Sequence, residues 1–383
     1  MTRIYLDHSA TTPVRPEVLD AMLPFLRDTY GNAGSIHRFG REARRAVDDA
    51  RDRVAALVNA DPREIVFTSG GTESDNLAVL GVVAADRRTQ RRIVVSAVEH
   101  HAVLDAAGYS RQHDGTDVVN VGVDSDGLVD LDEIAAAIND DTALVSVMHG
   151  NNETGTIQPV DRVAGLCAER GVIFHCDTVQ SVGKVPIDVA KWPVGMLAIS
   201  GHKIYGTKGV GACYVRNGVK IEAQAVGGAQ ERERRAGTEN VPGIVALGMA
   251  CELARTEMDE TSVRIATLRD ALERGILDCV HGAYVNGSRK HRLPHVLNVG
   301  FPDADGESLV LALDTEGIAV SSGAACTAGS LDPSHVLLAM GLPHVQAQSA
   351  IRFSLGRDTT RAEIVRVLER LPEVVARTHA RSQ

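Results

Sequence analysis

Residues 196–206 read MLAISGHKIYG and join a short apolar run to a turn that carries polar side chains. The run 196–200 has the length and composition of a buried strand. Ser200, His202 and Lys203 follow where this strand ends. Because ligands of open α/β sheets gather at the carboxyl ends of the strands, the stretch predicts a sheet strand with a ligand site beside it.

Similar strand-like runs recur on both sides of this stretch and alternate with helical segments. The further strands are predicted at residues 64–68, 92–96, 143–148, 172–176 and 209–215. This alternation is typical of an α/β layer structure built around a mostly parallel sheet.

The pattern changes near residue 251, where a charged amphipathic helix is predicted over residues 251–278. The segments predicted after it are strands 295–300, 318–321 and 350–354, with helices over 306–316 and from Arg361 onward. A soluble domain usually contains about 100 to 200 residues, so 383 residues are enough for two domains. We expect a large α/β domain at 15–255 and a smaller α+β domain made of 1–14 and 256–383.

The composition excludes several classes of protein. Hydrophobic residues make up 44% of the chain, yet no apolar run approaches the roughly 18 residues of a membrane span. A formal net charge of -10 disfavours a broad nucleic-acid-binding surface. The six cysteines contain no Cys-x-x-Cys pair, which argues against a disulfide framework or a metal site. The first residues lack the pattern of a signal or transit peptide, so we expect a cytoplasmic protein with no metal, membrane or direct nucleic-acid contact.

Lys203 is the candidate reacting group of the turn after residue 200. A lysine in a turn is usually only solvated, but Ser200 and His202 can donate hydrogen bonds to a phosphate beside it. Such a lysine can form a Schiff base with an aldehyde cofactor of the pyridoxal type. That ring needs a carboxylate at its nitrogen, and Asp177 follows another predicted strand, although an aspartate there is often only a helix cap. Gln180, one turn later, is placed to bond the phenolic oxygen.

Three further strand ends carry candidate contacts. Residues 68–74, TSGGTES, give a strand, a glycine turn and a helix start, where free N–H groups at Gly71 and Thr72 can cradle a phosphate. His100 could stack on the ring and carry protons, and Asn152 could bond the ring oxygen or a substrate carboxylate. Each has an ordinary alternative, namely a tight connection, a structural histidine or a turn.

Cys326 lies in the small-residue segment 321–330, SSGAACTAGS. A core cysteine normally has bulky apolar neighbours, and this one has none. The segment therefore predicts a presented, reactive thiol on a mobile loop rather than a buried side chain.

With these residues in place, the chain closely resembles the cysteine desulfurases of the NifS/IscS group, which are fold-type I pyridoxal-phosphate enzymes of aminotransferase class V. The resemblance covers nearly the whole length. The motifs that carry it are YLDHSATTP (5–13), TSGGTESDN (68–76), NNETGTIQPV (151–160), SGHKIYG (200–206), RRAGTEN (234–240), SSGAACTAG (321–329) and IRFSLGR (351–357).

The resemblance implies a role for each candidate residue. Cofactor contacts would come from Gly71, Thr72, His100, Asn152, Gln180, Ser200 and His202, with Asp177 at the ring nitrogen and Lys203 holding pyridoxal 5'-phosphate. Thr238 would reach the phosphate of a partner subunit, which implies an obligate homodimer. Arg352, together with Asn152, would bind the substrate carboxylate through its planar fork of donors.

The implied reaction converts L-cysteine to L-alanine and leaves the sulfur as a persulfide on Cys326 for an acceptor protein. The alternatives are a selenocysteine lyase, another class V enzyme, or a catalytically silent docking scaffold. The acceptor pathway stays open among iron-sulfur assembly, tRNA thiolation, DNA phosphorothioation and biosynthesis. The C-terminus, shorter than in relatives that dock a scaffold through a tail, adds to that open question.

Overall fold

The computed structural model describes residues 3–322 and 332–379. The largest sheet in the described residues has seven strands in the order β2-β8-β7-β6-β5-β3-β4. These strands are β2 (Ile65–Thr68), β3 (Arg92–Ser96), β4 (Asp117–Val121), β5 (Thr142–Ser146), β6 (Ile173–Asp177), β7 (Met196–Ser200) and β8 (Gly211–Val215). Only β8 runs antiparallel to its neighbours, so the prediction of an α/β fold with a mostly parallel sheet is confirmed.

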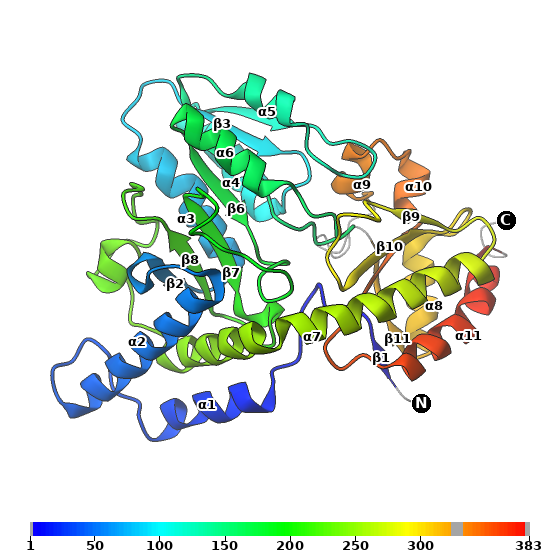
Figure 1. Cartoon of the computed structure of the whole chain (residues 1–383), viewed down its shortest axis with the longest axis horizontal. Coiled ribbons are helices and arrows are strands. Elements are labelled where there is room, and N and C mark those ends of the chain that lie inside the picture. The colour runs from blue at the N-terminus through cyan, green and yellow to red at the C-terminus, as the bar shows by residue number, and fades with distance from the viewer. Residues whose placement is uncertain (1–2, 323–331, 380–383) are drawn as a thin grey trace.

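Helices cover both faces of this sheet (Figure 1). They are α1 (Pro16–Arg27), α2 (Arg38–Val58), α3 (Gly71–Ala85), α4 (His101–Asp114), α5 (Leu131–Ala137), α6 (Val160–Arg170) and α7 (Val241–Cys279), with short 3-10 turns η1 (Pro62–Glu64), η2 (Gly201–Lys203) and η3 (Gln230–Glu233). Side chains alternate between the faces along each strand. Ile93 and Val95 belong to the hydrophobic cluster that includes residues of α3 and α4, whereas Val94 belongs to the cluster that includes residues of α1, α2, α6 and α7.

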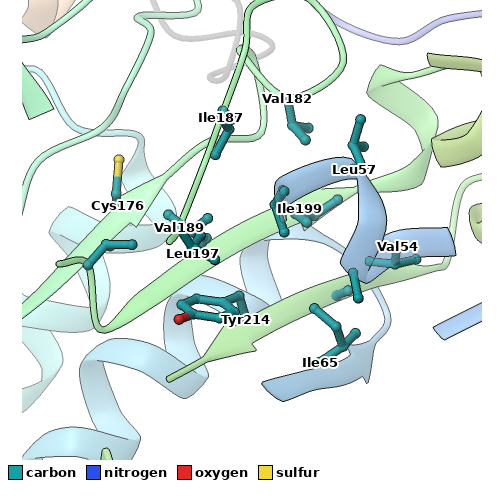
Figure 2. Close-up of a cluster of buried hydrophobic side chains, with 14 of the residues drawn as sticks. Val54, Leu57, Ile65, Cys176, Val182, Ile187, Val189, Leu197, Ile199 and Tyr214 are labelled. Atoms are coloured by element: carbon teal, nitrogen blue, oxygen red, sulfur yellow. The ribbon is translucent and has the colours of Figure 1, made fainter. Parts of the chain in front are cut away.

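The face toward α2 holds the larger hydrophobic core. Figure 2 shows part of it, where Val54 and Leu57 of α2 meet Ile65, Leu197 and Ile199 of the sheet. Burying each such aliphatic side chain contributes about 1.5–3 kcal/mol, and this core fixes the strand ends that position the site.

The remaining segments form two smaller sheets. A four-stranded antiparallel sheet has the order β12-β13-β10-β9, and β1 pairs with β11 in parallel. These strands are β1 (Ile4–Tyr5), β9 (Tyr284–Asn286), β10 (Val296–Gly300), β11 (Ile318–Ala319), β12 (Ser321–Ser322) and β13 (Ala350–Ser354). The accompanying helices are α8 (Gly306–Thr315), α9 (His335–Ala339), α10 (His344–Gln348) and α11 (Arg361–His379).

The long helix α7 runs beside both sets of elements (Figure 1). It packs against α1, α2 and α11. It begins at Val241 rather than at the predicted residue 251. Every residue from 241 to 251 is buried or half-buried, so no exposed polar face marks this part of the helix in the sequence. The predicted boundary at residue 255 falls inside this helix, and the division into domains 15–255 and 1–14 with 256–383 stays a prediction.

One predicted strand is divided in two. Residues 318–321 are split between β11, which pairs with β1, and β12, which pairs with β13. The chain changes sheets at Val320, and a sequence pattern of alternating residues cannot reveal such a change. Within residues 3–322 and 332–379, no helix is both long and apolar enough to cross a membrane.

Candidate active site

A cavity of about 280 Å³ lies where β6 and β7 end and α3 begins. It brings together most of the residues predicted from the sequence. Those that line it are Gly71, Thr72, His100, Asn152, Asp177, Gln180, Ser200, His202, Lys203 and Arg352. Residues from widely separated strand ends therefore share one space, as expected for the carboxyl edge of an α/β sheet.

Lys203 ends the short turn η2, directly after β7. Its Nζ donates to the carbonyl oxygen of Ser9, and to that of Ala10 at 2.8 Å. The turn is fixed from the same side, because Thr12 donates to the His202 carbonyl through its N–H at 3.0 Å and its hydroxyl at 2.9 Å. The amino-terminal segment thus holds the lysine at the cavity wall.

A second lysine lies behind the first. The Nζ of Lys184 donates to the carbonyl oxygens of Gln180 and Lys203, each at 3.1 Å. Burial, together with the positive charge of Lys203, lowers the pKa of Lys184 to about 7. The charge of Lys203 therefore disfavours the charged form of Lys184, and no sequence motif predicted this proximity.

Asp177 ends β6 and is buried, with only 6% of its surface exposed. Its Oδ1 accepts a hydrogen bond from Val179 N at 2.8 Å. Burial raises the pKa of Asp177 to about 6, against the lowering effects of that hydrogen bond and of Lys203. A protonated ring nitrogen placed here would stabilise the carboxylate and would itself be held in its charged form.

The start of α3 has the features of an anion cradle. Its N-cap, Gly70, provides no side-chain hydrogen bond, so the first N–H groups of the helix are not capped by it. A Cβ at Gly71 would come within 2.8 Å of Val179 Cγ2, so only glycine fits without a shift of that side chain. The turn therefore brings backbone donors close to the cavity.

Two buried polar atoms at the cavity lack a partner among the described residues. Gln180 donates through Nε2 to Ser9 O at 2.9 Å, but its Oε1 forms no hydrogen bond. The Oδ1 of Asp75, a cavity residue not foreseen from the sequence, is also without one. Unsatisfied buried polar atoms are costly, and a polar ligand such as pyridoxal phosphate fits a site that offers Gln180, Asp177 and a helix start together.

His100 is the N-cap of α4, and its Nδ1 accepts from Ala102 N at 3.1 Å. This contact leaves the ring proton on Nε2. Burial, with smaller effects of Lys203 and His101, lowers the pKa of His100 to about 4, so the ring is neutral at physiological pH. The geometry suits ring stacking and hydrogen-bond donation, whereas proton transfer to Nδ1 would require loss of the Ala102 contact.

His202 is held in a similar way. Its Nδ1 lies 3.1 Å from Thr11 Oγ1, and burial with nearby lysine charges lowers its pKa to about 4. Ser200 is buried at the end of β7, and a Cβ at Gly71 would lie 3.7 Å from Ser200 Cβ, so Ser200 is next to the start of α3.

Arg352 enters the cavity from β13 and is 2% exposed. It donates through Nη2 to Asp7 Oδ1 at 2.7 Å and through Nη1 to Asn152 O at 3.1 Å. Its Nε has no hydrogen-bond partner among the described residues. The pairing of Asp7 with Arg352 was not predicted, although both residues lie in motifs quoted above. It joins segments far apart in the sequence, and their proximity depends on the tertiary fold.

Two predicted residues are not in the cavity. Thr238 is exposed, lies five residues after Glu233, the last residue of the turn η3, and does not line the cavity in this single chain. Cys326 lies outside the described residues, as does 323–330 of the segment 321–330 that was predicted to be mobile, whereas Ser321 and Ser322 form β12. After that segment, Ser334 donates to Glu153 Oε2, and His335 Nε2 lies 2.9 Å from Glu99 O, so the chain rejoins the site beside Asn152.

Comparisons with known proteins agree with this arrangement. The family described as aminotransferase class-V matches residues 4–367. A cysteine desulfurase from Nostoc sp. is 49% identical over 382 residues, which cover 100% of this chain and 95% of that protein. A solved NifS-like protein has a TM-score of 0.92 at 39% identity, covering 98% of this chain and 100% of its own. Another solved structure, SspA in complex with cysteine, has a TM-score of 0.82 at 33% identity, covering 94% and 100%.

Proposed function

The chain belongs to the aminotransferase class-V family and is a pyridoxal-phosphate-dependent cysteine desulfurase, and from this premise we propose which residues carry each part of the reaction. The observation that carries the assignment is the meeting of Lys203, Asp177 and the uncapped start of α3 around one cavity. Bound pyridoxal phosphate supplies an electron sink for the bond changes at the substrate carbon atoms.

We propose that Lys203 holds the cofactor and that Asp177 pairs with its ring nitrogen. The phosphate would be bound by Gly71 and Thr72 with Ser200 and His202. His100, Asn152 and Gln180 would contact the ring and its oxygen. The half-buried, neutral side chains of His100 and His202 support this division, because they add hydrogen-bond donors without adding charge.

The substrate carboxylate would bind Arg352, with Asn152 beside it. Arg352 lines the cavity and donates to Asp7 and to the Asn152 carbonyl, and its Nε has no hydrogen-bond partner among the described residues. A planar guanidinium binds a carboxylate through two parallel hydrogen bonds. This contact would orient the α-hydrogen of L-cysteine toward Lys203 Nζ, which removes that proton as a general base.

Sulfur transfer would take place on Cys326. Its thiolate attacks the sulfur of the substrate, so a sulfur–sulfur bond forms as the carbon–sulfur bond breaks. The carbon product takes up a proton and leaves as L-alanine, while Cys326 keeps the sulfur as a persulfide. An acceptor protein then takes the persulfide sulfur for iron-sulfur assembly, tRNA thiolation, DNA phosphorothioation or biosynthesis. We propose that the reaction takes place in the cytoplasm.

A homodimer is part of the proposal, because Thr238 is expected to serve the partner subunit's phosphate site. Large apolar side chains are exposed on nearby loops, with Ile36 and Val226 each 91% exposed and Tyr30 73% exposed. A contiguous apolar patch on a protein surface favours an interface, and contact with a second chain would cover these side chains. Light scattering should give the mass of two chains, and a fully active monomer would contradict this part.

The test of the assignment is the Lys203→Ala variant with Lys191→Ala as its matched control. Lys191 is 80% exposed and lies away from the cavity, so its loss should leave alanine production intact. Lys203→Ala should abolish alanine production from cysteine and remove the visible absorbance of the lysine-bound cofactor. Undiminished turnover in Lys203→Ala would refute the role of this lysine.

A further inference from the structure

Three buried carboxyl groups interact at the cavity, where Asp75 and Asp177 belong to its lining and Glu99 does not, and only Asp177 has an assigned task. Asp75, Glu99 and Asp177 are 1%, 0% and 6% exposed. Among the described residues, no lysine or arginine forms an ion pair with Asp75 or Glu99. A buried carboxylate without a cation is strongly disfavoured, and several in one place disfavour each other further.

A chain of polar contacts leads away from Asp75 through β6 and β5. The Oδ1 of Asp75 lies 3.4 Å from His175 Nε2, and His175 Nδ1 lies 2.9 Å from Ser146 Oγ. Beyond Ser146, Glu99 Oε1 accepts from Ser96 Oγ at 2.7 Å and from Met148 N at 2.6 Å. All these side chains are buried, so their protons must be distributed among themselves.

One proton can be placed in two ways between Asp75 and His175, the first two residues of this series of polar contacts. Neither Asp75 Oδ1 nor His175 Nε2 has a hydrogen-bond partner of normal geometry, although they face each other. Either the imidazole donates to a charged Asp75, or a neutral Asp75 donates to the imidazole. If Asp75 is charged, a second negative charge lies near Asp177 without a lysine or arginine to pair with it. If Asp75 is neutral, no such charge is added.

We propose that Asp75 works as a protonated, neutral acid that donates its proton to His175 Nε2, so that Asp177 alone carries the negative charge offered to the ring nitrogen. Asp75 is then a positioning residue that acts through Asp177, and this inference rests on the proposed function. His175 would donate from Nδ1 to Ser146, whose hydroxyl completes the chain toward Glu99.

The electrostatics of the pocket agree with this order of ionisation. Burial, then the charges of Asp177 and Glu99, raise the pKa of Asp75 well above its ordinary value. The pKa of Glu99 is raised to about 8, mainly by burial, while that of Asp177 rises only to about 6. The titratable groups that face Asp75 are Asp177, His175 and Cys176 from β6, Glu99 after β3 and Cys213 from β8.

The test compares a neutral substitute with one that cannot donate. Asp75→Asn keeps the shape and a donor for His175, so the purified, cofactor-loaded variant should turn over cysteine within about threefold of the wild type. Asp75→Leu removes the donor and should lose activity, as should Asp177→Asn, which removes the required charge. Severe loss in Asp75→Asn at full cofactor occupancy, equal to that of Asp177→Asn, would overturn the proposal.

A second readout needs no cofactor. If the folded wild type must keep a proton on Asp75 that the unfolded chain releases, its stability falls as the pH rises, whereas Asp75→Asn lacks this penalty. The melting temperature of the cofactor-free Asp75→Asn variant, relative to wild type, should therefore increase between about pH 6 and about pH 8. A difference independent of pH would mean that Asp75 is charged. This measurement would stand even if Lys203→Ala showed that the proposed function is wrong.

Discussion

Removal of the Glu231 carboxylate should destabilise the protein strongly, although Glu231 lies outside the cavity. Arg51 and Glu231 have side chains that are only 7% and 3% exposed. The carboxylate accepts from Arg51 Nη2 at 2.6 Å, from Arg51 Nη1 at 2.9 Å and from Phe67 N at 2.9 Å. The Glu231→Ala substitution would leave Arg51 buried with the Ile65 carbonyl as its remaining hydrogen-bond acceptor.

Breaking a buried pair from one side costs about 3–5 kcal/mol, because an uncompensated charge remains. The matched control is Glu42→Ala, which breaks an Arg–Glu pair whose side chains are 84% and 43% exposed, and such exposed pairs contribute about 0.3–0.5 kcal/mol. Thermal unfolding of both variants and of wild type gives the comparison. Arg51→Ala combined with Glu231→Ala should cost less than the sum of the single changes.

The reasoning is refuted if Glu231→Ala has the same melting temperature as Glu42→Ala. It is also refuted if the loss of stability in the double variant equals the sum of the losses in the two single variants. The result also concerns the site, because Glu231 anchors the segment that leads to Thr238. Three consecutive residues there, at 231, 232 and 233, have φ values of 46°, 57° and 64°. Non-glycine residues in this region are strained, and the buried ion pair offsets that strain.

Two further predictions concern the sulfur carrier and the pH dependence of stability. Cys326→Ser should still bind the cofactor and cysteine but transfer no sulfur, and mass spectrometry of cysteine-treated wild type should find the added sulfur on Cys326; its presence on another cysteine would remove that role. Burial raises the pKa of Glu153 from 4.5 to about 7, so the folded state binds more protons than the unfolded state between these values and stability should fall as the pH rises through that window. Glu153→Gln should flatten this part of the curve of melting temperature against pH, and an unchanged slope would contradict it.

Much of the large sheet was predictable because its strands are short, buried and bounded by turns. The predicted strands 92–96 and 196–200 agree with β3 and β7, those at 64–68, 143–148, 172–176 and 209–215 differ from β2, β5, β6 and β8 only at their ends, and β4 was not predicted. The parallel arrangement then indicated which residues share an edge, so Asp177, His100 and Lys203 could be grouped without coordinates. The start of α7 was not predicted, because a helix buried all round has no polar face to mark it.

Contacts between segments far apart in the sequence were harder to predict. Asp75 lies four residues after Gly71 on α3, and this spacing would have placed it on the same helix face. The pairing of Lys203 with the Ser9 and Ala10 carbonyls had no such signal, because it joins irregular backbone to a turn in a distant part of the chain. Cys326, Thr238 and the domain limits stay predictions.

The amino-terminal segment has a consequence for the order in which the site can be completed during synthesis. Residues 7–12 are made before their partners, because Lys203 is 194 positions after Ser9, and Arg352 is 345 positions after Asp7. On the ribosome this segment must wait, without its native partners, until β7 and then β13 have emerged. Contacts that close such long loops form late and slowly. A nascent chain halted before β13 can hold a folded sheet, but it cannot hold a finished substrate pocket.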